Sequence, residues 1–346
     1  MPDPFDLIVV GAGATGLHAA RIAEAAGLDV LVLEATPRVG GRILTERTTA
    51  GDVVDSGAQL LNGDMPRALA RVAEAGVALR TLPAGGDAVV IAQGRVQRVA
   101  EAPSFLPRLA TALPDAIPAG VTLAAWLDTL ALDAAARQLA ESEIREMYGQ
   151  PTTRLDARAA CDTARSFDSD RPEAEFQLEG GMERMIARMA AGLRRAPQVD
   201  TPVLRVVEHA NGATVVTGEA ELDAHHALVA ATPTVAARID YACADGESLR
   251  QALDAWINGD LIKFHLFYER AFWRDAGLSG AAVIADVCGL SVLDTTLDAP
   301  RLTAFIGGTI AREWAAEGED ERTRRLLDAL LLEVTIFTFS MIPQSH

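Results

Sequence analysis

The sequence predicts an α/β protein in which a parallel-sheet domain holds an inserted α+β domain. Residues 6–33 read as strand, helix and strand, and strand hairpins are predicted around residues 93 and 211. A stretch with helical spacing lies between these hairpins. With 346 residues, 49% of them hydrophobic, the chain is long enough to bury about two cores.

The first predicted element is a βαβ unit. Asp6–Val10 is a short β-branched apolar run, Gly13–Ala26 is an Ala-rich helical stretch, and Asp29–Leu33 is a second buried-strand pattern. Strand, helix and strand in this order are typical of a parallel sheet. We therefore expect an α/β core at the start of the chain.

Two hairpins are expected as antiparallel additions to this core, each with a turn that ends in glycine. They are Ala88–Ile91 with Arg95–Val99 around Gln93-Gly94, and Val203–Val207 with Ala213–Thr217 around Asn211-Gly212. Residues 104–160 are rich in Ala, Leu and Arg at helical spacing. They predict a helical insertion that is broken by Pro107, Pro114 and Pro118.

The formal charge of −17 argues against a nucleic-acid partner, because phosphate binding needs a basic face. It would weakly attract cationic small molecules, although surplus Asp and Glu also simply keep a surface soluble. No apolar run reaches the length of a membrane span, and Met1–Asp6 has no basic leader region. We expect a soluble cytoplasmic protein with no membrane partner, and a homo-oligomer stays open.

The cysteines suggest neither a metal site nor a disulfide. Cys161, Cys243 and Cys288 are far apart, and none has a metal-ligand spacing. We expect reduced, buried thiols and no metal. No catalytic triad or carboxylate pair stands out in the sequence either.

A glycine-rich fingerprint, GAGATG, directly follows the first strand and opens the helix. Gly11 permits a tight turn, Gly13 lets the backbone approach a pyrophosphate, and Gly16 lets helix and strand pack closely. The positive end of the helix would face the phosphates. The pattern predicts a Rossmann-like domain, with a nucleotide-free glycine turn as the alternative. The candidate cofactor contacts are Gly11, Gly13, Ala14, Thr15 and Gly16.

The end of the second strand narrows the choice of dinucleotide. Glu34 stands where an acidic side chain accepts hydrogen bonds from an adenosine ribose, which disfavours NADP. The following RxGGR segment resembles the second phosphate-contacting motif of flavin-dependent amine oxidases and related flavoproteins, and it favours FAD over NAD. Its glycines allow a turn over the cofactor, and an arginine offers charge-assisted hydrogen bonds; an Arg-capped surface turn is the alternative. The candidate contacts are Ala35, Arg38, Gly40, Gly41 and Arg42.

Further segments resemble the flavin-containing amine oxidase family over most of the chain. Asp55–Gln59 is similar to a D-x-G-A stretch that approaches the flavin, and Glu179–Met182 is similar to an EGG turn. Thr201–Val203 is similar to a segment that contacts adenine, and Ala231–Pro233 to an A-x-P turn near the cofactor. The resemblance implies cofactor contacts from Gly57, Ala58, Gln59, Val203, Ala231 and Thr232.

A further match is Gly259–Phe264 followed by Phe272-Trp273, which resembles the family's G-x-x-x-K…FW signature. In the family this lysine reaches the flavin N5 through a water, so Lys263 is the catalytic candidate. Alternation places Leu261, Lys263, His265 and Phe267 on one strand face. An exposed edge lysine and a satisfied core histidine are the alternatives for Lys263 and His265.

The resemblance implies oxidation of the C–N bond of an amine or amino acid to an imine by FAD, with oxygen as acceptor giving hydrogen peroxide. It also implies a glutathione-reductase-type FAD domain in residues 1–75 and 179–238. A substrate domain would occupy 76–178 and 239–325, and an atypical tail 326–346. Cavity candidates are Met147, Tyr148 and Phe176, and candidates for a carboxylate clamp are Arg145, Arg154 and Arg158.

The family's C-terminal FAD segment, with its substrate-walling aromatic residues and flavin-facing helix, has no match here. Leu326–His346 reads as a helical LLDALLLEV and an apolar TIFTFSMI. We therefore expect non-covalent FAD, exposed apolar surface and doubtful activity, with an FAD-binding remnant or interaction protein as the alternative. A related desaturase or porphyrinogen oxidase shares the first motifs, but Lys263 with Phe272-Trp273 argues against it. An NAD-dependent dehydrogenase has no use for RxGGR.

Overall fold

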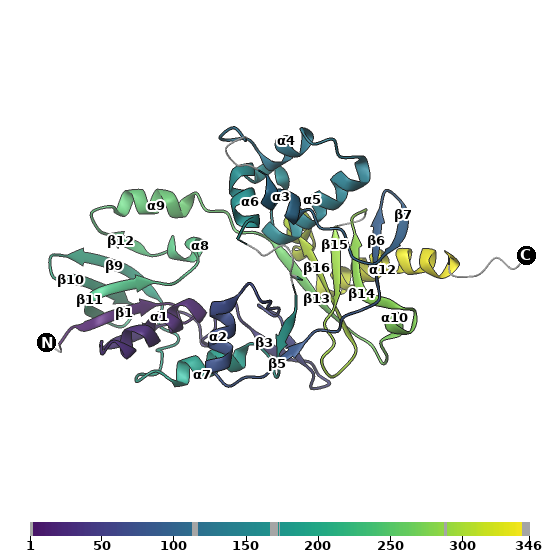
Figure 1. The fold of residues 1–346 in the computed structure, drawn as a ribbon. Helices are drawn as coiled ribbons and strands as arrows, with labels where there is room; N and C mark the ends of the chain where they lie inside the picture. Colours follow the sequence, from purple (N-terminus) through teal and green to yellow (C-terminus); the bar gives the residue numbers. More distant parts are fainter. Residues whose placement is uncertain (1–2, 113–116, 167–171, 173, 287–288, 341–346) are drawn as a thin grey trace, which may run out of the picture. The chain divides into compact units, whose positions relative to one another are not determined.

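The computed structural model describes residues 3–112, 117–166, 172, 174–286 and 289–340, and describes no side chain in 331–340. The chain forms two compact units (Figure 1). Unit 1 comprises Met1–Thr81 and Glu173–Asn258, and unit 2 comprises Leu82–Pro172 and Gly259–His346. The chain therefore leaves the first unit and returns to it, as the predicted insertion requires.

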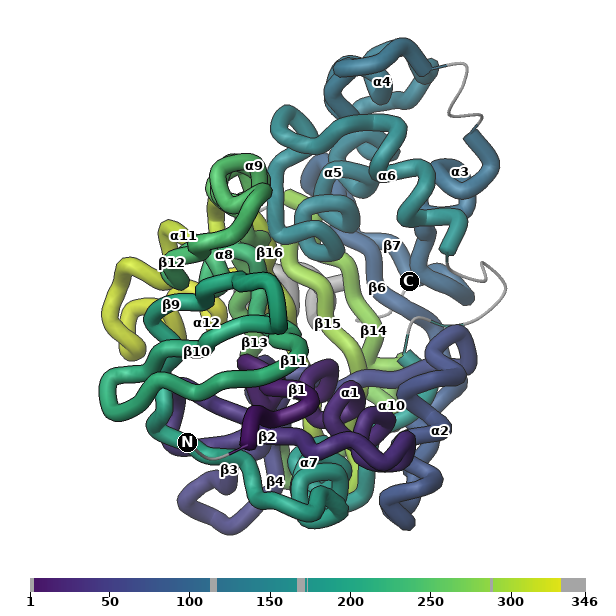
Figure 2. The backbone as a smooth tube through the Cα atoms, turned by 90° about the vertical axis from the view of Figure 1, so that its left-hand side faces the viewer, coloured from purple at the N-terminus to yellow at the C-terminus, as the bar shows by residue number. Residues whose placement is uncertain are grey.

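Unit 1 is built on a six-stranded sheet. In spatial order its strands are β12 (Asp240–Ala242), β9 (Val203–His209), β10 (Gly212–Thr217), β11 (Glu221–Val229), β1 (Phe5–Val10) and β2 (Val30–Leu33). Strand β1 pairs in parallel with both β2 and β11, whereas β9, β10 and β11 form an antiparallel meander. Figure 2 shows the meander continuing the sheet beside β1. The predicted βαβ unit and the second hairpin are confirmed.

The sheet is buried on both faces at β1 and β2, where successive residues point to opposite sides. Val9 packs with Leu17 of α1 (Ala14–Ala25) and Ile186 of α7 (Glu183–Ala191). Its neighbour Ile8 packs with Val215 of the meander. The continuous apolar run of β1 is thus explained by burial on two sides.

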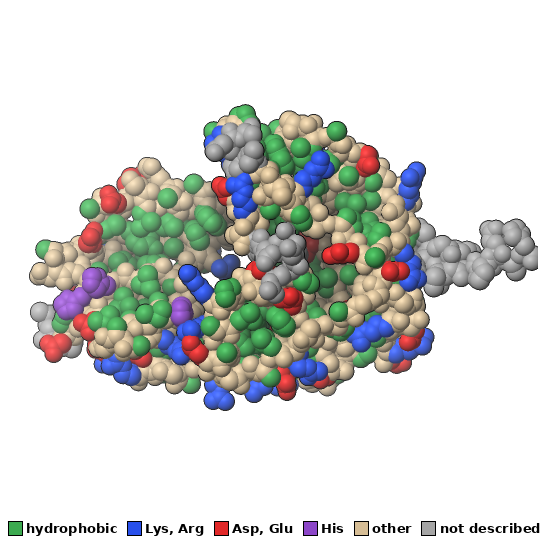
Figure 3. Space-filling view, viewed as in Figure 1, with side chains coloured by type: hydrophobic (Ala, Val, Ile, Leu, Met, Phe, Trp, Pro, Cys, Tyr) green, Lys and Arg blue, Asp and Glu red, His purple; other side chains and the backbone are tan. Residues whose placement is uncertain are grey.

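The remaining elements of unit 1 are short. They are β3 (Thr45–Arg47), β4 (Val53–Asp55), α2 (Pro66–Glu74), β5 (Leu79–Thr81), β8 (Phe176–Leu178), α8 (Pro233–Ala236) and α9 (Gly246–Asp254). Figure 3 shows hydrophobic side chains gathered over α8 and α9. In and after these helices, Val235, Leu249, Trp256 and Ile257 are exposed.

Unit 2 has its own six-stranded sheet. In spatial order its strands are β13 (Leu261–Phe267), β16 (Arg301–Gly307), β15 (Leu290–Asp294), β14 (Leu278–Ile284), β6 (Asp87–Ala92) and β7 (Arg95–Val99). Neighbours are antiparallel except β14 and β6. The predicted β6–β7 hairpin is confirmed, and its turn residues Gln93 and Gly94 both have positive φ, as a type I′ turn needs.

One face of this sheet packs against α11 (Gly308–Ala315) and α12 (Glu319–Ser340). Ile262, Phe264 and Ile306 belong to that apolar core. Neighbouring residues along a strand point to opposite faces, and directly paired residues point to the same face. Lys263 with its partner Phe305, and His265 with its partner Thr303, therefore lie on the opposite face of the sheet. The predicted shared face of Lys263 and His265 is confirmed.

Helices cover part of the Lys263-bearing face. The predicted helical insertion is observed as α3 (Leu106–Thr111), α4 (Leu123–Asp128), α5 (Ala134–Tyr148), a 3₁₀ turn (Thr152–Arg154) and α6 (Ala157–Ala164). Side chains of Thr122, Asp133 and Asp156 cap three of its helices. The break predicted at Pro107 is wrong. This proline lies in the first turn of α3, where its missing N–H costs nothing, and Pro114 lies outside the described residues.

The C-terminal stretch is helical over more of its length than the pattern predicted, since α12 continues through Ser340. Cys161 and Cys243 are free thiols, and Cys288 lies outside the described residues. Across the described ranges, no helix is long and apolar enough to cross a membrane. In the same ranges, no group of three or more His, Cys, Asp or Glu could hold a metal.

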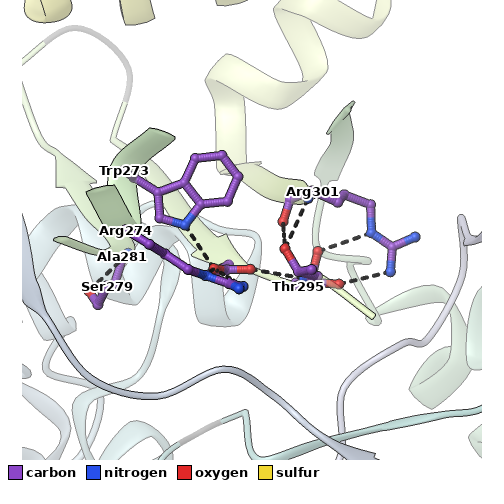
Figure 4. A network of polar contacts seen from close by, with 8 residues as sticks. Trp273, Arg274, Ser279, Ala281, Thr295 and Arg301 are labelled. Carbon is purple, nitrogen blue, oxygen red and sulfur yellow. Dashed lines mark hydrogen bonds and ion pairs between the residues drawn. The ribbon is translucent and has the colours of Figure 1, made fainter. Parts of the chain in front are cut away.

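A buried carboxylate fixes the end of the unit 2 sheet (Figure 4). Asp294 accepts hydrogen bonds from Trp273 Nε1 at 2.8 Å and from Arg274 Nη2 at 2.6 Å. The Asp294 side chain is 2% exposed, whereas that of Arg274 is 42% exposed. The buried Asp294 carboxylate is therefore paired with the Arg274 guanidinium, which remains partly accessible to solvent.

Replacement of this carboxylate should destabilise the protein. Asp294→Ala leaves the indole N–H of Trp273 without its acceptor, so we expect a loss of about 2–3 kcal/mol in the free energy of unfolding. Asp275→Ala is the matched control, since its pair with Arg270 is 67% and 78% exposed and should contribute less than about 0.5 kcal/mol. Urea unfolding measures both, and equal losses would contradict the assignment.

Candidate functional site

The glycine loop lies at the carboxyl edge of the unit 1 sheet, between β1 and α1. Gly11 has a φ of +106°, and its N–H donates to the Leu33 carbonyl at 2.7 Å. A Cβ at Gly16 would lie 1.9 Å from the Gly11 carbonyl oxygen. The first and third glycines are thus required by the fold itself.

Gly13 differs from these two glycines. Its φ of −73° suits any residue, and a Cβ there would meet only the Gly41 Cα, at 4.0 Å. The fold does not require glycine at this position. A group that approaches the backbone closely at the start of α1 would require it, and a pyrophosphate is such a group.

Glu34 ties the end of β2 to the glycine loop. Its Oε2 accepts from the Ala12 N–H at 2.8 Å, and its Oε1 accepts from the Thr36 N–H and hydroxyl at 3.0 and 2.8 Å. A carboxylate has about four acceptor positions. The three hydrogen bonds that the Glu34 carboxylate accepts are therefore compatible with a further bond from a ribose hydroxyl.

The GGR turn packs directly on the glycine loop. Gly40 donates its N–H to the Ala12 carbonyl at 2.9 Å, and Gly13 and Gly40 form an isolated bridge. The Arg38 guanidinium donates to the carbonyls of Gly41 and Ile43 at 2.8 and 2.9 Å. Arg38 thus holds the turn, whereas Arg42 and Ala35 are exposed.

The DSGAQ stretch joins the same assembly through backbone contacts. A Cβ at Gly57 would lie 2.2 Å from the Arg42 carbonyl oxygen, and the Ala58 N–H donates to that oxygen at 3.0 Å. Gln59 is 3% exposed. Its Oε1 finds no hydrogen-bond donor in the described part of the chain, which is unusual for a buried amide.

Asp55 connects this stretch to the EGG turn. Its Oδ1 accepts from the Thr45 hydroxyl at 2.5 Å and from the Met182 N–H at 3.0 Å. A Cβ at Gly181 would lie 2.3 Å from Thr45 Cγ2. Two motifs that are more than 100 residues apart are therefore joined by one buried carboxylate.

The last predicted contacts lie at the same edge of the sheet. The segment before Val203 runs beside Glu34, since the Thr201 N–H donates to the Glu34 carbonyl at 2.8 Å. Ala231 and Thr232 follow β11, whose Ala230 carbonyl lies 3.0 Å from a Cβ built on Gly11. The structure thus places every predicted cofactor contact in unit 1.

Lys263 belongs to unit 2 and is the only lysine of the chain; the other 30 basic residues are arginines. It is half-buried, and its Nζ lies 5.7 Å from the centroid of the Phe305 ring. A cation over an aromatic face is stabilised by the ring quadrupole. The strand thus holds an ammonium on a partly apolar surface.

A chain of hydroxyl groups links the neighbouring His265 to buried Arg301. Its Nδ1 lies 3.1 Å from Thr303 Oγ1, which lies 2.6 Å from Thr295 Oγ1. Buried Arg301 donates to Thr295 Oγ1 through Nε at 3.3 Å (Figure 4). A guanidinium only donates, so Thr295 Oγ1 accepts from Arg301 and can direct its own proton to Thr303 Oγ1. In that arrangement Thr303 donates to Nδ1, and we infer that a neutral ring carries its proton on Nε2.

The sequence-predicted cavity and clamp residues are scattered. Tyr148 donates its hydroxyl to the Ala160 carbonyl at 3.1 Å, and burial raises the pKa of this phenol. Arg158 donates to the Ile117 carbonyl, Phe176 lies in unit 1, and Arg154 is exposed. Arg145 remains a candidate at the sheet, where its side chain lines Gly289 and Gly308, and Met147 is half-buried on the same helix.

Sequence reasoning missed Glu146, which sits between these two residues on α5. Its Oε2 accepts a short hydrogen bond from the Ser291 hydroxyl of β15. The two residues are 145 positions apart, so no local pattern could pair them. A glutamate on the sheet-facing side of a helix was the one available signal.

Comparisons with known proteins identify similar chains over most of the length. A family model described as flavin containing amine oxidoreductase matches residues 14–332. Putrescine oxidase of Kocuria rosea is 29% identical, with 94% of this chain and 78% of the relative covered. L-amino acid dehydrogenase of Synechocystis is 28% identical, covering 94% and 78%. The structure of cyclohexylamine oxidase from Brevibacterium oxydans IH-35A superposes with a TM-score of 0.86 at 26% identity, covering 95% and 81%.

Two glycine replacements should separate cofactor binding from folding. Gly13→Ala has room in the fold, so its thermal stability without cofactor should equal that of the original chain, while FAD affinity falls at least about 10-fold. Gly16→Ala should destabilise even the cofactor-free protein by about 2 kcal/mol or more, because the new Cβ strikes a backbone oxygen. Calorimetry measures the thermal stability of both variants, and titration measures their FAD affinity. Unchanged FAD affinity in Gly13→Ala would refute the assignment of Gly13 as a cofactor contact.

The tautomer of His265 is open to direct measurement. In ¹⁵N-histidine-labelled protein at a pH that deprotonates the imidazolium, the His265 resonances should be those of the tautomer protonated at Nε2. His265→Ala identifies the signal among the six histidines. Thr303→Val should abolish the tautomer preference, because it removes the hydroxyl that faces Nδ1. A ring protonated at Nδ1 in the original chain would contradict the inferred direction of the hydroxyl chain.

Proposed function

Since the chain belongs to the family of flavin containing amine oxidoreductases, we propose that it oxidises the C–N bond of an amine or amino acid to an imine with FAD, and that dioxygen reoxidises the cofactor. The proposal includes non-covalent binding of FAD by the cofactor contacts that were predicted from the sequence.

One observation carries the proposal of a dinucleotide site in unit 1. Glycine backbones of three segments meet at one sheet edge, through the Gly13–Gly40 bridge and the contact of Gly57 with Arg42. Among the glycines of these segments, Gly13 combines room for a Cβ with an ordinary φ, so close approach of a ligand explains the glycine there. Gln59 Oε1, which has no hydrogen-bond donor among the described residues, adds a buried acceptor to the same assembly.

The proposed roles follow the order of the contacts. Glu34 and the backbone of Val203 would bind the adenosine, and the N–H groups at the start of α1 would bind the pyrophosphate. The backbone of Gly57 to Gln59 would lie against the flavin. FAD when bound takes up two electrons and two protons as the amine becomes an imine, and passes them to dioxygen as hydrogen peroxide.

Lys263 would stabilise the negative charge that develops as dioxygen is reduced. Its ammonium is half-buried on the Phe305 ring, where an electrostatic interaction is stronger than in water. A lysine is a compact point charge, unlike the planar guanidinium. That difference is consistent with a lysine at this position in a chain whose other 30 Lys and Arg residues are all arginine.

The proposal is tested by FAD titration and peroxide formation. Protein stripped of cofactor should bind FAD with a visible flavin spectrum, and should bind NADP far more weakly because of Glu34. The FAD-loaded protein should release one hydrogen peroxide per imine formed with at least one member of a panel of monoamines, diamines and amino acids. FAD binding without peroxide or imine would favour a binding protein over an oxidase.

Lys263→Met should slow the reaction with dioxygen more than the reaction with amine. We expect the rate constant for reoxidation of reduced flavin to fall about 100-fold, because the variant lacks the positive charge. Lys263→Arg keeps the charge and should retain more of this rate. Stopped-flow absorbance separates the two half-reactions. Reoxidation by Lys263→Met at the original rate would remove Lys263 from this role.

A further inference from the structure

We propose that the open edge of β11 binds an extended, apolar segment of another polypeptide as an added β-strand. The open edge comprises residues 225–229, which pair with β1 on one side and with no described strand on the other. This strand-accepting surface lies within unit 1, and it is independent of the proposed oxidation.

Strand pairing shows where this edge begins. The first part of β11 pairs with β10 and the later part with β1, and the two ladders overlap only at Ala224. Ala224 is the partner of Ala213, next to the β9–β10 turn at which His209 pairs with Gly212. Beyond Ala224, the side of β11 that faces away from β1 is therefore open in the described part of the chain.

The backbone of this edge has unpaired polar groups. In a parallel ladder, the residues of a strand bond alternately to the strands on either side. The Ala230 N–H donates to the Val10 carbonyl at 2.8 Å, so every second residue before it also bonds to β1. The N–H and C=O groups of Ala227 and Val229 then point away from β1, and no described residue bonds to them. An extended peptide supplies the row of donors and acceptors that completes such an edge.

One face of the sheet is also incomplete at this edge. Val32, Val9 and Leu228 are successive partners across β2, β1 and β11, so their side chains point to the same side. Val32 and Val9 are 3% and 0% exposed in the core formed with α1, whereas Leu228 is 39% exposed. An added strand with an apolar side chain beside Leu228 would cover it. The occupant is therefore apolar on that face.

The edge lacks the features that commonly block pairing. Edge strands are often protected by lysine, proline or a β-bulge. Residues 225–229 are His-His-Ala-Leu-Val, and their register with β1 is unbroken. Nothing in this segment itself therefore prevents an added strand from pairing.

A free segment fits this edge better than a second copy of the chain does. Two copies paired through β11 would each bring the chain that follows β11 toward the β10 strand of the other. That strand already occupies the edge at Ala224. A free segment of about five residues, which spans about 17 Å, ends where the edge ends. The edge thus selects a short extended segment that has no strand beside it.

A synthetic strand tests the proposal. The probe is a blocked, fluorescent peptide of alternating valine and threonine, N-methylated at each threonine so that it cannot form sheets with itself. We expect saturable binding, and binding at least about 10-fold weaker when every residue is N-methylated, because that peptide has no N–H to donate. Amide hydrogen exchange at Ala227 and Val229 should slow when the probe binds. No binding, equal binding of the two peptides, or unchanged exchange would overturn the proposal.

Two aspartate variants locate the contact. Leu228→Asp puts a charge where the apolar side chain of the probe packs, so we expect its affinity for the probe to fall at least about 10-fold. Leu204→Asp is the matched control, because Leu204 of β9 is a leucine of the same sheet that is 52% exposed. Its affinity should change less than about 2-fold, and circular dichroism verifies that both variants fold.

Sedimentation equilibrium of the original chain tests the other occupant. We expect no self-association through this edge. A dimer that Leu228→Asp dissociates and Leu204→Asp does not would assign the edge to a second copy of the chain, and so would contradict the proposal.

Discussion

The close approach of glycine backbones at the carboxyl edge of the unit 1 sheet is the constraint on which the candidate cofactor site depends. Gly16 lies against Gly11, Gly40 against the Ala12 carbonyl, and Gly57 against Arg42. A side chain at Gly16 or Gly57 would meet backbone atoms that cannot move alone. These contacts bring three separate segments of the chain to one place, and buried Glu34 and Asp55 bond them together.

Local patterns predicted much of this arrangement. The βαβ unit, both hairpins and the shared strand face of Lys263 and His265 follow from periodicity and turn residues, because these signals act over a few positions. The motifs of unit 1 were also recognisable as separate segments. Their joining through the Asp55 carboxylate, which bonds Met182 across 127 positions, was not predictable because it depends on the tertiary fold.

The omissions have the same cause, whereas the error at Pro107 is local. A proline can break a helix, but in the first turn it begins one equally well. Glu146 and Ser291, and Trp273 and Asp294, meet only after the unit 2 sheet has formed. Tyr148, predicted for the substrate cavity, and Arg158, predicted for a carboxylate clamp, instead bond backbone carbonyls of unit 2, those of Ala160 and Ile117.

The single lysine of the chain joins these observations to the proposed chemistry. All Lys and Arg positions but one are arginine, and the exception is Lys263. Its ammonium lies over the Phe305 ring, on the sheet face that Glu146 also reaches. The most direct test is to add amines to the FAD-loaded protein without oxygen and to follow the long-wavelength flavin absorbance. We expect at least one amine to bleach this absorbance. An absorbance that no amine or amino acid changes would contradict the proposed oxidation.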